Sequence, residues 1–157
     1  MKKLIVLLVT FCFVFEAMAQ NQIKINKSQL FKDVQTLSSD EYEGRQVGTE
    51  GSKKTQAFLI GRFKEVGLKP INNSYEQKFS PKTGINGTNL YGMIEGKVKD
   101  KYLVLTAHYD HLGKKDNDVY NGADDNASGV AALLAYADYF NRNKPNYSIV
   151  FLFVDAE

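Results

Sequence analysis

Cysteine is almost absent from this sequence, and its absence excludes two classes of catalytic site. The 157 residues include a single cysteine, Cys12, which lies in an apolar segment at the N-terminus. The rest of the chain therefore has no disulfide, no cysteine nucleophile and no thiolate to bind a metal.

The sequence also lacks an excess of charge of either sign. It has 20 basic and 18 acidic residues, for a formal net charge of +2, and the N-terminal segment holds two of the lysines and one glutamate. A remainder with a net charge near +1 gives no electrostatic reason to expect binding to nucleic acid or to an anionic membrane surface. No internal repeat or low-complexity tract is visible.

Long apolar runs are missing except for one at the N-terminus, at residues 4–15. Two lysines precede it, and Ala-Met-Ala at 17–19 follows it. This pattern predicts a signal peptide over residues 1–19 and a mature chain that begins at Gln20, so we expect export to the periplasm or the extracellular space. The run is short for a bilayer span and no second run follows, so no stable membrane insertion is expected after cleavage, although an uncleaved anchor is the alternative.

The first half of the mature chain has two helical patterns. Apolar residues at helical spacing predict one helix over Ser28–Leu37, with Ser28 as its N-cap. A second helix is predicted over Ser52–Val66, and Gly67 is placed to cap its C-terminus. Residues 72–87 contain proline and glycine and predict a short strand followed by a turn.

The second half is typical of an α/β domain. Three short runs rich in valine, isoleucine, leucine and aromatic residues predict strands at 89–94, 102–107 and 148–154. Runs without alternation suit strands buried on both faces of a parallel or mixed sheet. A helical pattern from Val130 to Phe140 separates the last two runs. We therefore expect one α/β domain in which helices flank a mixed sheet.

Side chains of metal-binding type follow three of these predicted elements. The sequence Ala-His-Tyr-Asp-His occupies 107–111, Gly-Ala-Asp-Asp-Asn-Ala-Ser-Gly occupies 122–129, and Asp-Ala-Glu occupies 155–157. Ligands of α/β sheets gather at the carboxyl ends of the strands, so all three segments are expected to meet at one edge.

This set of side chains suits a site for divalent metal ions. An imidazole such as that of His108 is a good neutral zinc ligand, and a carboxylate can bridge two ions. Asp110 lies two residues further on and could accept the second ring N–H of His108. Nitrogen and oxygen ligands without cysteine favour zinc, although cobalt or manganese could substitute. A nearby glutamate could act as a general base.

Each of these residues also has an ordinary structural interpretation. Residues 124–126 could simply cap the following helix. Asp110 and Asp155 could be ordinary residues at strand ends, and Glu157 could be an uninformative charge. We expect His111 to point away from Asp110 or into solvent and to take no part in the site.

The order of the motifs resembles a known enzyme family. His-x-Asp at 108–110, Asp-x-x-Ser-Gly at 125–129 and Ala-Glu at 156–157 are similar to motifs of the co-catalytic two-zinc aminopeptidase family, which contains bacterial leucyl aminopeptidase, aminopeptidase Y, glutamate carboxypeptidase and glutaminyl cyclase. Gly-Arg at 44–45 and Gly-Thr-Glu-Gly at 48–51 also resemble the segment before the family's first catalytic strand. The resemblance covers nearly the whole mature chain.

The resemblance implies a three-layer fold, a mixed sheet flanked by helices, and a role for several residues. It implies that His108 binds one zinc ion, that Asp125 bridges two, and that Glu157 is the general base. Asp110 would orient His108. In the family the peptide bond after the bridging aspartate is often cis, so the Asp125–Asn126 bond is expected to be cis.

The family's later ligands are a glutamate directly after the general base, an aspartate and a histidine, and these have no counterpart in the sequence. Residues 20–157 are therefore expected to be the N-terminal portion of a zinc peptidase domain, truncated at the C-terminus. We expect the 157 residues by themselves to be an inactive fragment of a longer enzyme.

The function implied is an exported, zinc-dependent exopeptidase, an aminopeptidase that removes N-terminal residues from peptides. A carboxypeptidase or a glutaminyl cyclase of the same family is the nearest alternative. A secreted binding domain without catalysis is the alternative from another class, and a generic soluble domain with acidic capping loops is a third.

Overall fold

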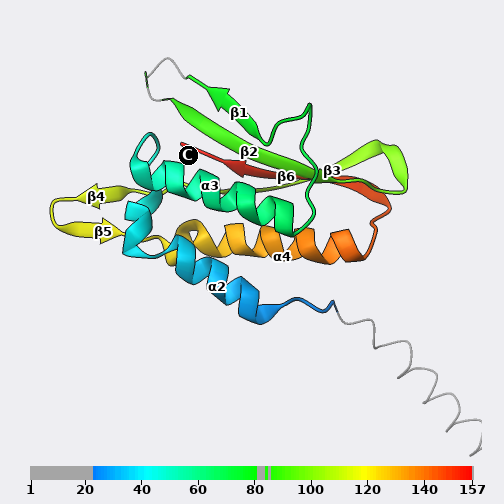
Figure 1. Cartoon of the computed structure of the whole chain (residues 1–157), viewed down its shortest axis with the longest axis horizontal. Helices are drawn as coiled ribbons and strands as arrows, with labels where there is room; N and C mark the ends of the chain where they lie inside the picture. Colours follow the sequence, from blue (N-terminus) through cyan, green and yellow to red (C-terminus); the bar gives the residue numbers. More distant parts are fainter. Residues whose placement is uncertain (1–22, 81–83, 85, 157) are drawn as a thin grey trace, which may run out of the picture.

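A computed structural model describes residues 23–80, 84 and 86–156 of the chain. The predicted signal peptide and Glu157 lie outside these residues. A four-stranded sheet runs through the molecule in the order β1 (Glu76–Phe79), β2 (Gly87–Ile94), β6 (Tyr147–Val154) and β3 (Val98–His108) (Figure 1). Within the described part of the chain, no helix combines the length and apolar character that crossing a membrane requires.

The sheet is mixed, as the sequence predicts. Strand β6 pairs parallel with β3 and antiparallel with β2, which in turn pairs antiparallel with β1. Helix α4 (Ser128–Arg142) lies in the chain between β3 and β6, which is the crossover that two parallel neighbours need. The prediction of an α/β fold with a mixed sheet flanked by helices is confirmed.

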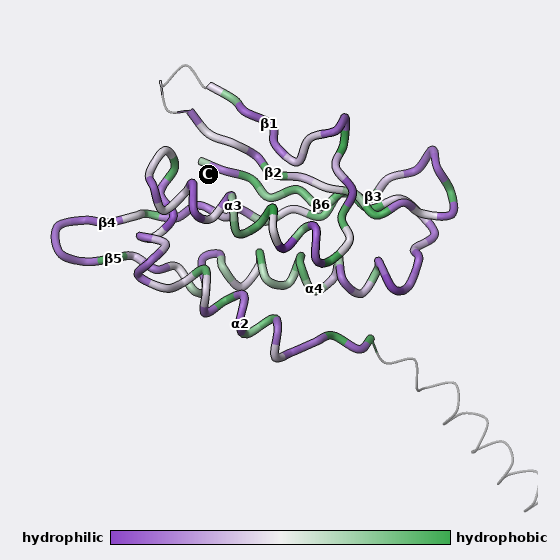
Figure 2. Tube along the Cα trace, in the orientation of Figure 1, coloured by the Kyte–Doolittle hydropathy of each residue, from purple (hydrophilic) through white to green (hydrophobic). Residues whose placement is uncertain are grey.

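The core lies between the sheet and helices α3 (Glu50–Glu65) and α4. Phe151 and Phe153 of β6 are fully buried, and the ring centroid of Phe153 lies 4.8 Å from that of Phe63 on α3. Helix α2 (Lys27–Leu37) packs mainly on α4. The apolar residues along β6 and on α4 contrast with the hydrophilic β4–β5 hairpin, formed by Gly113–Lys115 and Asp118–Tyr120 (Figure 2).

The predicted cap at the C-terminus of α3 is confirmed, whereas the predicted cap at the N-terminus of α2 is not. Gly67 adopts a φ of +78°, and the amide of Leu68 donates to the carbonyl of Phe63 at 2.9 Å, which closes the α3 terminus as a Schellman motif. Helix α2 begins earlier than predicted. Its N-cap is Asn26, whose side chain accepts from the amide of Gln29 at 3.1 Å, so the assignment of Ser28 as N-cap is wrong.

The prediction that the run at 102–107 is buried on both faces is also wrong for its first half. Tyr102, Leu103 and Val104 are 61%, 49% and 55% exposed. Strand β3 is the outer strand of the described sheet, so its side chains have a neighbouring strand on one side only. Apolar composition alone does not distinguish an outer strand from a central one.

Candidate metal centre

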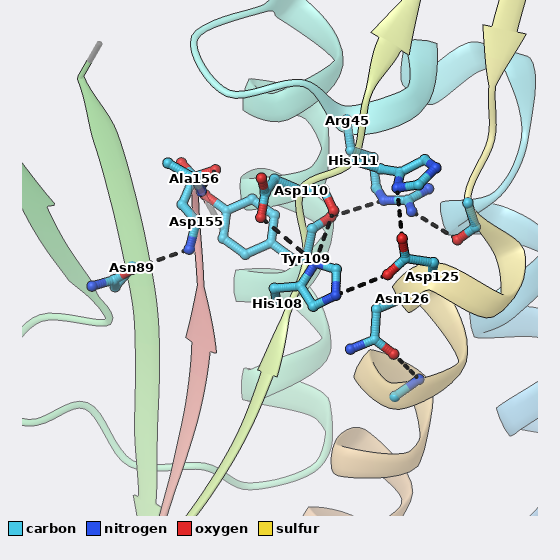
Figure 3. Close-up of polar contacts among 12 residues, drawn as sticks. Arg45, Asn89, His108, Tyr109, Asp110, His111, Asp125, Asn126, Asp155 and Ala156 are labelled. Atoms are coloured by element: carbon cyan, nitrogen blue, oxygen red, sulfur yellow. Dashed lines mark hydrogen bonds and ion pairs between the residues drawn. The ribbon is translucent and has the colours of Figure 1, made fainter. Parts of the chain in front are cut away.

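The ends of β3 and β6 bring two of the three predicted segments to one edge of the sheet. His108 is the last residue of β3 and pairs with Val154, the last residue of β6. The amide of Tyr109 donates to the carbonyl of Val154 at 2.9 Å, so the alignment continues one residue past the strand. Residues 108–111 and 155–156 therefore emerge side by side, and the loop before α4 meets them there (Figure 3).

At this edge His108 faces Asp125. Its Nε2 lies 3.0 Å from the Oδ1 of Asp125. The imidazole is mostly buried, with 14% of the side chain exposed, whereas 66% of the Asp125 side chain is exposed. Two side chains separated by 17 positions in sequence thus present a nitrogen and an oxygen to the same point, and that point is open to solvent on the carboxylate side.

The other ring nitrogen of His108 is held by Asp110. Nδ1 lies 3.2 Å from the backbone oxygen of Asp110 and 3.8 Å from its Oδ1. The predicted partner is therefore the right residue, and its carbonyl is nearer than its carboxylate. An acceptor at Nδ1 favours the tautomer with the proton on that atom, which leaves the Nε2 lone pair directed at Asp125.

In the loop before α4, neighbouring residues have different roles: Asn126 binds a helix amide, and Asp125 faces the histidines. Asn126 lies just before the N-cap residue of α4, and its Oδ1 accepts from the amide of Gly129 in the first turn at 3.0 Å. A Cβ on Gly129 would lie 2.3 Å from that Oδ1, so the glycine leaves room for this contact. The Asp125–Asn126 bond is cis, as the resemblance implies. Because Asn126 binds the helix amide, the carboxylate of Asp125 is left to contact the imidazoles of His108 and His111.

His111 takes a position that the sequence analysis did not predict. Its side chain is 13% exposed, and its Nδ1 lies 3.4 Å from the Oδ2 of Asp125, so it does not point into solvent and it lies beside the candidate carboxylate ligand. Burial lowers the pKa of His111, the nearby Asp125 carboxylate raises it, and the positive charge of Arg45 lowers it further. His111 contacts the oxygen of Asp125 that His108 does not.

Asp155 and Tyr109 form a separate, structural network beside the site. The carboxylate of Asp155 accepts from the amide of Thr88 at 2.9 Å, and the hydroxyl of Tyr109 donates to the carbonyl of Thr88 at 2.7 Å. Gln56 donates to the same hydroxyl at 3.0 Å. Burial raises the pKa of Tyr109, and the neighbouring Asp155 raises it further, so the phenol stays protonated. Asp155 thus serves as a strand-end residue that fastens β2 to β6.

The geometry of His108 and Asp125 fits a shared zinc ion. Zinc–nitrogen and zinc–oxygen bonds of about 2.0–2.2 Å at a tetrahedral angle place two ligand atoms about 3.3 Å apart. The observed separation of 3.0 Å between Nε2 and Oδ1 is close to that value. Among the described residues, no group of three or more histidine, cysteine, aspartate or glutamate side chains has the arrangement of a complete metal site. The structure therefore provides a pair of candidate ligands.

The comparison with known families decides how this edge is interpreted. Residues 89–157, which contain the His-x-Asp, Asp-x-x-Ser-Gly and Ala-Glu motifs, match the profile of peptidase family M28. This part of the chain is similar to peptidase family M28. The resemblance to co-catalytic zinc peptidases is thereby confirmed, and the likeness supports a metallopeptidase.

Individual similar proteins agree with that likeness. A vacuolar membrane protease of Schizosaccharomyces pombe is 34% identical over 76 residues, which are 48% of this chain and 8% of that protein. The structure of a leucine aminopeptidase precursor from Bacteroides thetaiotaomicron matches with a TM-score of 0.69 and 26% identity, over 87% of this chain and 49% of that one. A glutaminyl cyclase from the same organism, bound to N-acetylhistamine, matches with a TM-score of 0.68 and 26% identity, over 85% and 48%.

The chain thus spans about half the length of these solved structures and a small part of the curated protease.

Proposed function

We propose that this chain supplies His108 and Asp125 to the two-zinc site of an exported exopeptidase that acts as an aminopeptidase on peptides. The observation that carries the proposal is the 3.0 Å approach of the His108 Nε2 to the Asp125 Oδ1. Support comes from Asp110, which favours the tautomer that can bind a metal ion, and from the match of residues 89–157 to the model of a peptidase family.

In this proposal each of these residues has a separate role. His108 offers Nε2 to the metal ion, while Asp110 accepts from the other ring nitrogen. Asp125 offers two carboxylate oxygens, which is what a bridging ligand requires. Zinc, when bound, would polarise the scissile carbonyl and lower the pKa of water. Glu157 would take a proton from that water and return it to the leaving amine.

An aminopeptidase is favoured over a glutaminyl cyclase because the matching family profile is that of a peptidase and the curated relative is a protease. The cyclase stays the second candidate, since its structure is as similar to this chain as that of the leucine aminopeptidase. Both enzymes would act on the N-terminal residue of a peptide. They differ in whether the residue is released or closed into a ring.

The experiment that separates these activities uses the protein isolated from cells that make it naturally. We expect it to release leucine from a leucyl peptide, to lose this activity with a chelator and to regain it with added zinc. The same preparation should leave an N-terminal glutamine uncyclised. Cyclisation without hydrolysis would replace the aminopeptidase with the cyclase, and neither activity would indicate a binding domain. N-terminal sequencing of the same preparation tests the predicted start at Gln20.

A further inference from the structure

Arg45 is the largest of the fully buried side chains, at 1% exposure, and its guanidinium is surrounded by backbone oxygens. Nε donates to the carbonyl of Tyr109 at 2.8 Å. Nη1 donates to the carbonyls of Leu37 at 2.5 Å and Asn121 at 2.6 Å, and Nη2 donates to that of Gly122 at 2.9 Å. All four hydrogen bonds of this side chain to the described residues therefore end on backbone carbonyls.

These carbonyls belong to three segments that are far apart in the sequence. Leu37 is the last residue of α2, Tyr109 lies between His108 and Asp110, and residues 121–122 lead into the loop that carries Asp125. One planar group thus joins the segment with the candidate histidine ligand to the segment with the candidate carboxylate ligand. The two segments meet on either side of Arg45 in Figure 3.

We propose that Arg45 is a positioning residue that holds residues 121–125 against the end of β3, so that His108 and Asp125 reach the same metal ion. This inference rests on the metal centre proposed above. Arg45 acts on the site through the backbone. Its hydrogen bonds leave the carboxylate of Asp125 to face the two imidazoles.

The glycines around Arg45 show that the backbone is shaped to admit this side chain. A Cβ on Gly44 would lie 2.5 Å from the carbonyl oxygen of Tyr120 and 2.6 Å from that of Gly113. A Cβ on Gly122 would lie 2.7 Å from Nη2 of Arg45, and the residue has a φ of +54°. The Gly-Arg pair therefore has a steric basis: the glycine lets the chain pass against the β4–β5 hairpin, and the arginine then reaches the loops.

The positive charge of Arg45 lies near two carboxylates of the site. Burial disfavours a cation and lowers the pKa of Arg45, while the nearby carboxylates of Asp110 and Asp125 favour the charged form. Lysine could not replace it, because an ammonium has three donors at one point, whereas the guanidinium has five donors spread across a plane. A lysine at this position would lose contact with at least one of the three segments.

The test compares R45K with R62K as a matched control. Arg62 is also a poorly exposed arginine, with 13% of its side chain exposed, and it pairs with the buried Asp33 at 3.0 Å, but it lies on α3 away from the metal centre. Each folded chain is titrated with cobalt(II), and binding is followed by the paramagnetic broadening of the NMR signals of His108. We expect R45K to bind cobalt about tenfold more weakly than the unaltered chain and R62K to bind it equally well.

The outcomes separate this role from the metal centre. Equal cobalt affinity in R45K and the unaltered chain would overturn the role of Arg45 while leaving the metal centre in place. A failure of the unaltered chain to show broadening at His108 would overturn both. If R45K does not fold, the Nε–H of Arg45 in the unaltered chain decides instead: slow hydrogen exchange, with and without cobalt, is expected, and fast exchange would contradict the proposal.

Discussion

At the residue scale, the phenol of Tyr109 is a buried polar group beside the site that both donates and accepts a hydrogen bond. It is fully buried, donates to the carbonyl of Thr88 and accepts from Gln56. Removing it in Y109F leaves the carbonyl and the amide without this partner, so we expect a loss of about 1–3 kcal/mol in the free energy of unfolding. Urea denaturation, monitored by circular dichroism, measures this change in the free energy of unfolding.

The control for Y109F is Y136F, which changes the same atoms at a residue that is 40% exposed on α4. We expect Y136F to change the free energy of unfolding by less than about 0.5 kcal/mol. Equal effects of the two substitutions would show that the buried network contributes nothing beyond the loss of a hydroxyl group.

The sequence predicted part of the residue-scale arrangement. It placed His108 and the carboxylates at the same sheet edge, because the carboxyl ends of neighbouring parallel strands lie side by side. It did not place His111 beside Asp125, because the chain leaves the strand after His108 and the alternation of side chains no longer applies. It singled out Arg45 as part of a motif but gave it no role, since its partners are backbone atoms that no residue type reveals.

At the scale of single elements, the N-terminus of α2 tests how a helix begins. Asn26 supplies the cap that the sequence analysis assigned to Ser28. We expect N26A to lower the free energy of unfolding by about 1 kcal/mol, because the amide of Gln29 loses its acceptor. The matched substitution S28A, in the first turn of the same helix, should change it by less than about 0.5 kcal/mol. If S28A lowered the free energy of unfolding more than N26A in thermal or urea unfolding, Ser28 would be the cap after all.

The long elements were predictable and the short ones were not. Helices α3 and α4 and strands β2 and β6 have apolar patterns long enough to define their type. The β4–β5 hairpin has three residues in each strand and a polar sequence, so no periodicity marks it. Its position depends on contact with the segment before Arg45, where the carbonyl groups of Gly113 and Tyr120 approach Gly44.

At the scale of the whole molecule, the exposed apolar side chains of β3 govern how the 157-residue chain behaves in solution. Tyr102, Leu103 and Val104 lie on the outer strand of the described sheet. An apolar outer strand is a template for pairing with another chain, so we expect this chain to self-associate at high concentration. The substitution V104K should reduce the association measured by sedimentation velocity, because a charge in the strand opposes pairing.

The control for V104K is Y136K, which adds the same charge on α4. A fall in association of equal size in both variants would indicate a general effect of charge and would contradict pairing through β3. The need for such a test reflects what the sequence could not provide. It predicted strands and a mixed sheet, but the place of a strand in the order of the sheet is set by contacts between distant segments.

The central claim is that His108 and Asp125 bind the same zinc ion. The most direct measurement is anomalous diffraction at the zinc absorption edge from crystals of the protein grown with zinc. The account predicts an anomalous peak about 2.0–2.2 Å from both the His108 Nε2 and an Asp125 carboxylate oxygen. A crystal structure in which zinc contacts neither residue, or in which the two side chains point apart with zinc bound elsewhere, would contradict it.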